Sequence, residues 1–155
     1  MIREKPHRLP ASCYVGRVMA SFTICTKDRK PLLANDEIFE KFKTVLEEEV
    51  RNGGCEAPVY LFMPDHCHIL LEGKQAHSNV FDVVRRFKQK TGFWFSKNFG
   101  GTCWHRNFYD HIVRDDVDER KQVMYILNNP AKKGLIEDWK QYKFKGSTVY
   151  NFEEW

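Results

Sequence analysis

The stretch Ala57-Pro-Val-Tyr-Leu-Phe-Met-Pro-Asp-His-Cys-His-Ile-Leu-Leu-Glu-Gly73 decides the fold. Its first apolar run, Val59 to Met63, is separated by the breaker Pro64-Asp65 from a second run, His66 to Leu71. Two short apolar runs around a two-residue breaker are typical of a β-hairpin. We therefore predict two antiparallel strands here, joined at the Pro-Asp turn.

The two histidines of this hairpin are candidate metal ligands. Because side chains alternate along a strand, His66 and His68 share one face, while Cys67, Ile69 and Leu71 point toward the core. The two imidazoles can then reach one divalent ion, and neutral imidazole is a common metal ligand. The alternative is a pair of half-exposed histidines without a metal, which is the more frequent situation for this feature alone.

Size and composition indicate one globular domain over residues 1–155, with a sizeable core. No apolar run approaches the length of a membrane span, and the charged N-terminus lacks the apolar segment of a signal peptide, so we expect a cytoplasmic protein. The five cysteines contain no Cys-x-x-Cys pair, which argues against a zinc ribbon and favours reduced thiols. A net charge of +4 permits a nucleic-acid partner without requiring one.

Periodicity and turn residues around the hairpin predict the remaining elements. Asn35 or Asp36 can cap a first helix that ends at Asn52-Gly53-Gly54, and a second helix starts near Ser78-Asn79. Strands are expected within residues 14–26 and at Phe108–Val113. A third helix, capped by Asp115 or Asp116, runs to about Asn129 because Pro130 cannot continue it, and residues 131–155 form a tail without a decided structure.

The resulting order, β-α-β-β-α-β-α, is that of the split βαβ, ferredoxin-like sandwich. We therefore predict an α+β fold in which an antiparallel sheet carries helices on one face, with an added C-terminal helix and tail. A helix added at the C-terminus of this fold lies close to the centre of the sheet. The third helix and the strand with His66 and His68 could thus face each other.

Tyr125 on the third helix is a candidate nucleophile. It lies two residues from Val123 and from Leu127, which belong to the apolar stripe, so it points away from them. Asn129 follows four residues later and could supply an amide oxygen as third metal ligand, although its position before Pro130 biases it away from helical geometry. Lys121, four residues earlier, could stabilise a phenolate or a phosphate. An ordinary surface tyrosine is the alternative.

A tyrosine beside such a cation site suggests phosphoryl transfer. A phenol with a free pKa near ~10 is a weak nucleophile, and a divalent ion on the phosphate would stabilise the transition state and orient the ester. Tyr125 would attack phosphorus and release a 3′-hydroxyl, and the resulting 5′-phosphotyrosine conserves the energy needed for rejoining.

Basic side chains are candidates for DNA phosphate contact. Residues 1–12 read as a basic arm, although a disordered tail is an equal alternative, and the second helix carries positive charges with no acid after Asp82. The candidates are Arg3, Arg8, Arg85, Arg86, Lys88, Lys90, Arg114, Lys121, Lys132 and Lys133.

Several motifs together resemble one family. Met63-Pro-Asp-His-Cys-His-Ile-Leu-Leu-Glu72 resembles the His-hydrophobic-His (HUH) motif of single-tyrosine transposases, with Cys67 in the hydrophobic slot. Phe108-Tyr-Asp-His-Ile-Val-Arg114 and Tyr125-Ile-Leu-Asn-Asn-Pro-Ala-Lys-Lys-Gly-Leu135 resemble later blocks of the REP-associated tyrosine transposases. So does the opening, His7-Arg-Leu-Pro10, with the strand that ends in Cys25-Thr-Lys-Asp-Arg29.

The resemblance implies an HUH endonuclease that cleaves and joins single-stranded DNA, often beside a short hairpin, with Mg²⁺ or Mn²⁺. It implies that His66, His68 and Asn129 are metal ligands and that Tyr125 is the nucleophile. It leaves Asp110, His111 and Arg114 without a firm role, and Asp110 and His111 could be only a hydrogen-bonded pair. It favours a monomer over dimers that exchange the tyrosine helix.

Two other functions stay open from the residues alone. One is a non-catalytic ferredoxin-like module that binds single-stranded nucleic acid through stacking aromatics. The other is a metal-dependent phosphoesterase that uses an activated water, with Tyr125 incidental.

Overall fold

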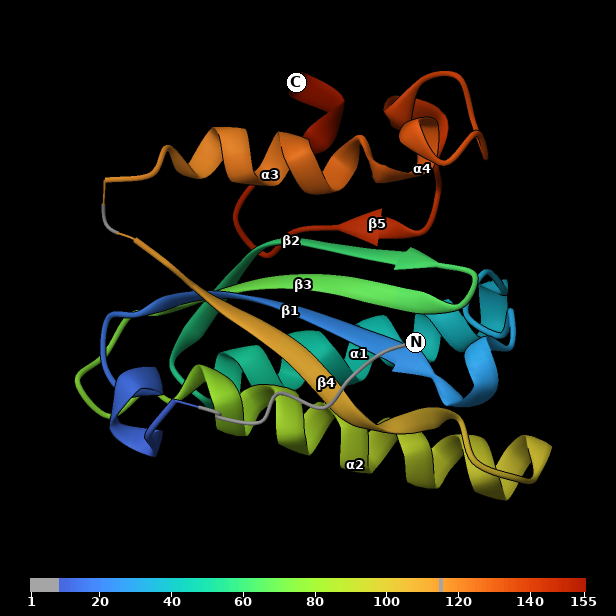
Figure 1. The fold of residues 1–155 in the computed structure, drawn as a ribbon, viewed down its shortest axis with the longest axis horizontal. Helices are drawn as coiled ribbons and strands as arrows, with labels where there is room; N and C mark the ends of the chain where they lie inside the picture. The colour runs from blue at the N-terminus through green and yellow to red at the C-terminus, as the bar shows by residue number, and fades with distance from the viewer. Residues whose placement is uncertain (1–8, 115) are drawn as a thin grey trace.

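A five-stranded antiparallel sheet with the order β4-β1-β3-β2-β5 forms the centre of the molecule (Figure 1). The computed structural model describes residues 9–114 and 116–155. The strands are β1 Met19–Thr26, β2 Cys55–Met63, β3 His66–Gly73, β4 Trp104–Val113 and β5 Lys145–Gly146.

Helices cover both faces of this sheet (Figure 1). On one face, α1 (Asp36–Asn52) and α2 (Val80–Phe99) pack together, with the rings of Phe42 and Phe87 6.1 Å apart. On the other face, α3 (Glu119–Leu127) lies against β2 and is followed by the short α4 (Asn129–Lys132). The predicted ferredoxin-like α+β sandwich with an added C-terminal helix is confirmed.

The hairpin forms as predicted, and its register fixes which side chains face the core. Met63 pairs with His66 across the Pro64-Asp65 turn, and Phe62 pairs with Cys67. The Phe62 ring lies 5.4 Å from that of Phe39 on α1, so this alternate set of side chains points toward α1. His66 and His68 therefore point to the opposite face, the one on which α3 lies.

Three predicted boundaries shift. The first strand begins at Met19, because residues Ala11–Tyr14 form a 3₁₀ turn and Gly16 takes a φ of 92°. The fourth strand spans all of residues 104–113. The third helix is capped by Asp118, whose carboxylate accepts from the Arg120 N–H at 2.9 Å. Asp116 does not cap it, and Asp115 lies outside the described residues.

Pro130 separates α3 from α4. The helix α3 ends at Leu127, and Pro130 occupies the first turn of α4, where its missing N–H has no intrahelical partner to lose. Asn129 is thus the first residue of a new turn.

Residues 131–155, whose structure the sequence left undecided, contain strand β5 and pack against the sheet. Phe144 and Tyr142 are buried, the Phe62 N–H donates to the Phe144 carbonyl at 2.8 Å, and the Tyr142 hydroxyl donates to the Phe62 carbonyl at 2.6 Å. These bonds dock the two-residue strand β5 on the β2 edge. No helix in the described ranges has the length and apolar character needed to cross a membrane.

Candidate active site

His66 and His68 lie side by side on β3, with ring centroids 4.9 Å apart and ring planes at 86°. The Nδ1 of His66 donates to the Asp65 carboxylate at 2.7 Å, and the Nδ1 of His68 lies 3.1 Å from the Thr23 hydroxyl on β1. A partner at Nδ1 fixes the orientation of an imidazole and leaves its Nε2 as the ligating atom.

Both imidazoles are held neutral. Burial lowers the pKa of His66 below its usual range even though the Asp65 carboxylate acts in the opposite direction. Burial is the main cause that lowers the pKa of His68 to about 4, and the neighbouring His66 and Lys133 act in the same direction. Neutral imidazoles keep the nitrogen lone pair that binds a metal ion.

Two buried side-chain atoms in the described part of the chain lack a hydrogen-bond partner: His68 Nε2 and Asn129 Oδ1. An unpaired buried polar atom costs about 1–3 kcal/mol, so a native structure rarely keeps one without a reason. His66, His68 and Asn129 offer two imidazole nitrogens and an amide oxygen, which fit a divalent ion. Within residues 9–114 and 116–155, no cluster of three or more histidines, cysteines and carboxylates is arranged for a metal. A site here would therefore depend on the Asn129 amide.

Tyr125 presents its phenol to solvent, as predicted. Its side chain is 67% exposed, while Val123 and Leu127 on the same helix are fully buried. The Lys132 ammonium lies 5.8 Å from the centroid of the tyrosine ring. Asn129, expected one turn after Tyr125, is half-buried at the start of α4, where its amide oxygen is buried and Pro130 follows it.

A cleft of about 400 Å³ opens beside His66, and we call it the Lys133 cleft. Arg29 in the turn after β1 lines it, and its Nε donates to the second oxygen of Asp65 at 2.9 Å. From the sequence, neither Arg29 nor Asp65 was assigned a site role, although both stand in motifs that carry the family resemblance. The lining residues are Arg29, Pro31, Met63, Pro64, Asp65, His66, Lys133 and Leu135.

The helix α2, which contains four of the basic candidates, lies on the face of the sheet opposite α3 (Figure 1). The sequence of α2 has no acid after Asp82, but α1 supplies one, because Lys90 pairs with the buried carboxylate of Glu49. Arg85 lies 3.3 Å from Asp82, and the Lys88 ammonium donates to the His105 carbonyl at 2.9 Å.

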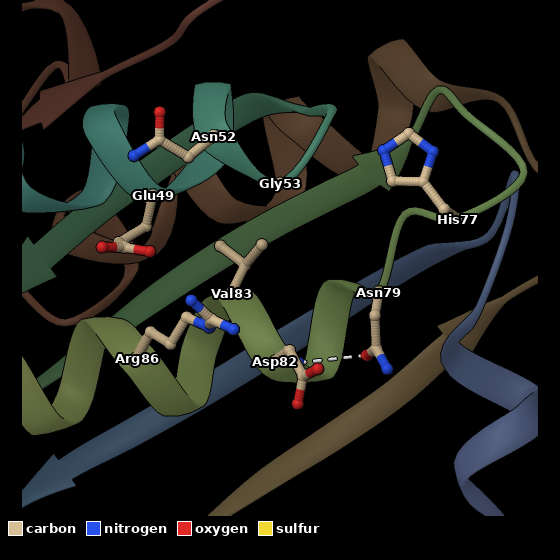
Figure 2. A pocket seen from close by; sticks show the side chains of 8 residues that line it. All are labelled: Glu49, Asn52, Gly53, His77, Asn79, Asp82, Val83 and Arg86. Atoms are coloured by element: carbon tan, nitrogen blue, oxygen red, sulfur yellow. Dashed lines mark hydrogen bonds between the residues drawn. The ribbon is translucent and has the colours of Figure 1, made fainter.

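Arg86 lines a small pocket of about 180 Å³ between α1 and α2, where it faces Glu49 (Figure 2). The pocket is thus far from the candidate site, on the other side of the sheet.

Of the remaining basic candidates, three are on the histidine side of the molecule. Lys121 is exposed on α3, and Lys132 and Lys133 follow at α4. Arg114 lies 3.4 Å from Asp116 at the exposed end of β4. Arg3 and Arg8 lie outside the described residues.

Asp110 and His111 do not form a pair. They are neighbours on β4, so they point to opposite faces; buried Asp110 accepts a 2.5 Å hydrogen bond from the Tyr14 hydroxyl, whereas His111 is exposed. Asp110 therefore has a structural role that ties the N-terminal turn to the sheet.

Fold and site together define an α+β protein in which a helix with an exposed tyrosine crosses a sheet with paired histidines. The chain belongs to the family described as Transposase IS200 like, whose sequence pattern matches residues 14–129.

Relatives and one solved structure agree with this membership. A Haemophilus influenzae protein provisionally named a REP-associated tyrosine transposase is 30% identical over 139 residues, covering 79% of this chain and 77% of its own. The Escherichia coli K12 REP-associated tyrosine transposase is 26% identical over 125 residues, with 76% and 71% covered. The fold matches a REP-associated tyrosine transposase bound to a REP hairpin, at a TM-score of 0.76 and 19% identity, over 92% of this chain and 82% of that one. These findings support a transposase role.

Proposed function

We propose that the chain cleaves and rejoins single-stranded DNA beside hairpins by transesterification at Tyr125. The observation that carries the proposal is that His68 Nε2 on β3 and Asn129 Oδ1 on α4 are both buried without a hydrogen-bond partner. The tyrosine helix α3 and α4 lie on one face of the sheet (Figure 1). A transposase fold and a structural neighbour described as bound to a REP hairpin support DNA as the substrate.

In the proposed reaction, the Tyr125 hydroxyl oxygen attacks the phosphorus of a phosphodiester and loses its proton to solvent. A bond forms between the tyrosine oxygen and phosphorus, and the bond from phosphorus to the 3′-oxygen breaks. The leaving 3′-oxygen takes up a proton, and the other strand segment stays attached through its 5′-phosphate. A 3′-hydroxyl that attacks this phosphotyrosine reverses the step and rejoins DNA without ATP.

The site residues prepare the phosphate for attack. His66, His68 and Asn129 would hold Mg²⁺ or Mn²⁺, which when bound supplies positive charge to the transferring phosphate. Asp65 orients His66 through Nδ1, and Thr23 does the same for His68. The exposed phenol of Tyr125 is open to a DNA strand approaching from solvent.

A covalent-adduct assay tests the proposal. The protein is incubated with pooled 3′-labelled hairpin oligonucleotides and Mn²⁺, and the products are separated on a denaturing gel. We expect a protein-linked band that disappears with EDTA and in Tyr125→Phe. Tyr109→Phe, at a half-buried tyrosine on β4, is the matched control and should keep the band.

Other outcomes would identify the two remaining functions. Cleavage without a linked band, retained in Tyr125→Phe, would indicate a phosphoesterase that uses water. DNA binding without cleavage, and with unchanged affinity in His68→Ala, would indicate a non-catalytic binding module.

A further inference from the structure

The Lys133 cleft combines an apolar wall with a cationic rim directly beside a candidate metal ligand. Pro31, Met63, Pro64 and Leu135 supply the apolar surface, and Leu135 is 50% exposed despite its size. His66 lines the same cleft, so its contents would lie next to the candidate metal site. Ligand pockets are typically lined by apolar side chains with a few polar groups, and this cleft has that composition.

The two cations of the cleft differ in how they are held. Arg29 is fixed, because its Nε bonds Asp65 and its terminal nitrogen donates to the Cys25 sulfur at 3.4 Å. Lys133 is exposed and has no ion-pair partner among the residues the structure describes. Its charge nevertheless acts on both histidines, which places the ammonium within electrostatic reach of the site. An unpaired ammonium next to an apolar wall is suited to a phosphate attached to a base.

We propose that the Lys133 cleft binds one unpaired nucleotide adjacent to the phosphate that Tyr125 attacks. Its base lies against Leu135 and Pro31, and its own phosphate pairs with Lys133. A volume of about 400 Å³ accommodates a single nucleotide but not a base pair. The inference rests on the proposed function, and it adds the residues that would hold the nucleotide beside the cleaved bond.

A binding measurement tests the base contact independently of catalysis. We would use Tyr125→Phe protein and the fluorescent hairpin oligonucleotide that binds most tightly in the pool, with an abasic site placed at each flanking position in turn. At one position the abasic site should weaken binding about 5-fold or more. Leu135→Ala should weaken binding of the intact oligonucleotide and abolish its sensitivity to that abasic site. Val149→Ala, at another exposed apolar residue, is the control and should retain the sensitivity.

A salt titration tests the phosphate contact. Lys133→Gln should reduce the slope of log affinity against log salt by about one unit, as expected for the loss of one phosphate contact. Lys97→Gln, at an exposed lysine on α2, should leave the slope unchanged.

An abasic profile that stays the same in Leu135→Ala, or an unchanged salt slope in Lys133→Gln, would overturn the nucleotide cleft. Because these measurements use the Tyr125→Phe protein, such a result would leave adduct formation by the parent protein untouched. Conversely, the parent protein could form no adduct while the Leu135→Ala and Lys133→Gln variants change the abasic sensitivity and the salt slope as expected. That result would refute the transesterase and keep the cleft as a binding site.

Discussion

His68 should make the metal-free protein sensitive to acid. Its pKa of about 4 in the folded state lies below the ~6.5 of a free imidazole, so the unfolded state binds the proton first as pH falls. The contribution of neutral His68 to the free energy of unfolding is therefore fully present above pH ~6.5. It is lost as the pH falls toward about 4, and the total loss is up to about 3 kcal/mol. Urea unfolding in EDTA at several pH values should show a shallower loss for His68→Gln. His111→Gln, at an exposed histidine, should follow the parent, and equal slopes for all three proteins would contradict the assignment.

Some site residues could be predicted from sequence because one strand contains them. Alternation alone places His66 and His68 on one face, whatever the rest of the chain does. Arg29 and Asp65 could not be predicted, because they meet only when β1 and β3 pair with Cys25 opposite His66. The buried amide of Asn129 depends in the same way on how the chain turns at Pro130.

At the scale of elements, Lys90 should stabilise the contact between α1 and α2. Its partner Glu49 is only 4% exposed, and removal of one partner leaves a buried carboxylate without its cation. Since Lys90 itself is 56% exposed, we expect Lys90→Gln to lower the free energy of unfolding by about 1–2 kcal/mol, with DNA affinity unchanged.

The control for this prediction is Arg85→Gln, which breaks an exposed ion pair with Asp82 and should cost less than about 0.5 kcal/mol. Glu49→Gln combined with Lys90→Gln should recover part of the loss. A Lys90→Gln protein of full stability with a reduced salt slope for DNA would instead make Lys90 a phosphate contact.

Helices and strands with a clear apolar periodicity and capping residue could be predicted from the sequence. Those that form only by pairing with another part of the chain could not. The sequence shows both the helical spacing of apolar residues in α1 and its capping residue Asn35. In the structure, the Asn35 side chain accepts a hydrogen bond from the Ile38 N–H at 3.0 Å. The two-residue strand β5 is too short to show a periodic pattern of apolar residues. It forms because it pairs with the exposed edge of β2. Its place in the sheet follows from buried Tyr142 and Phe144, which could equally have belonged to a helix.

At the scale of the whole molecule, the C-terminal segment holds the tyrosine helix against its own sheet. The guanidinium of Arg120 on α3 lies 3.9 Å from the ring centroid of Trp155, and the Tyr150 hydroxyl donates to the Glu119 carboxylate. Val123 and Leu127 bury the other side of α3. These contacts hold α3, with Tyr125, on the sheet that contains the paired histidines.

We accordingly expect each monomer to form a complete site. Tyr125→Phe supplies intact histidines and His68→Ala supplies an intact tyrosine, so a mixture of the two proteins should form no covalent adduct with the labelled hairpin pool. A mixture of parent protein with either variant should form adduct in proportion to the parent alone. Restored adduct in the mixture of variants would mean that subunits exchange α3, because only a swapped pair joins an intact Tyr125 to an intact His68. Light scattering at the assay concentration would then reveal a dimer in place of the expected 18.4 kDa monomer.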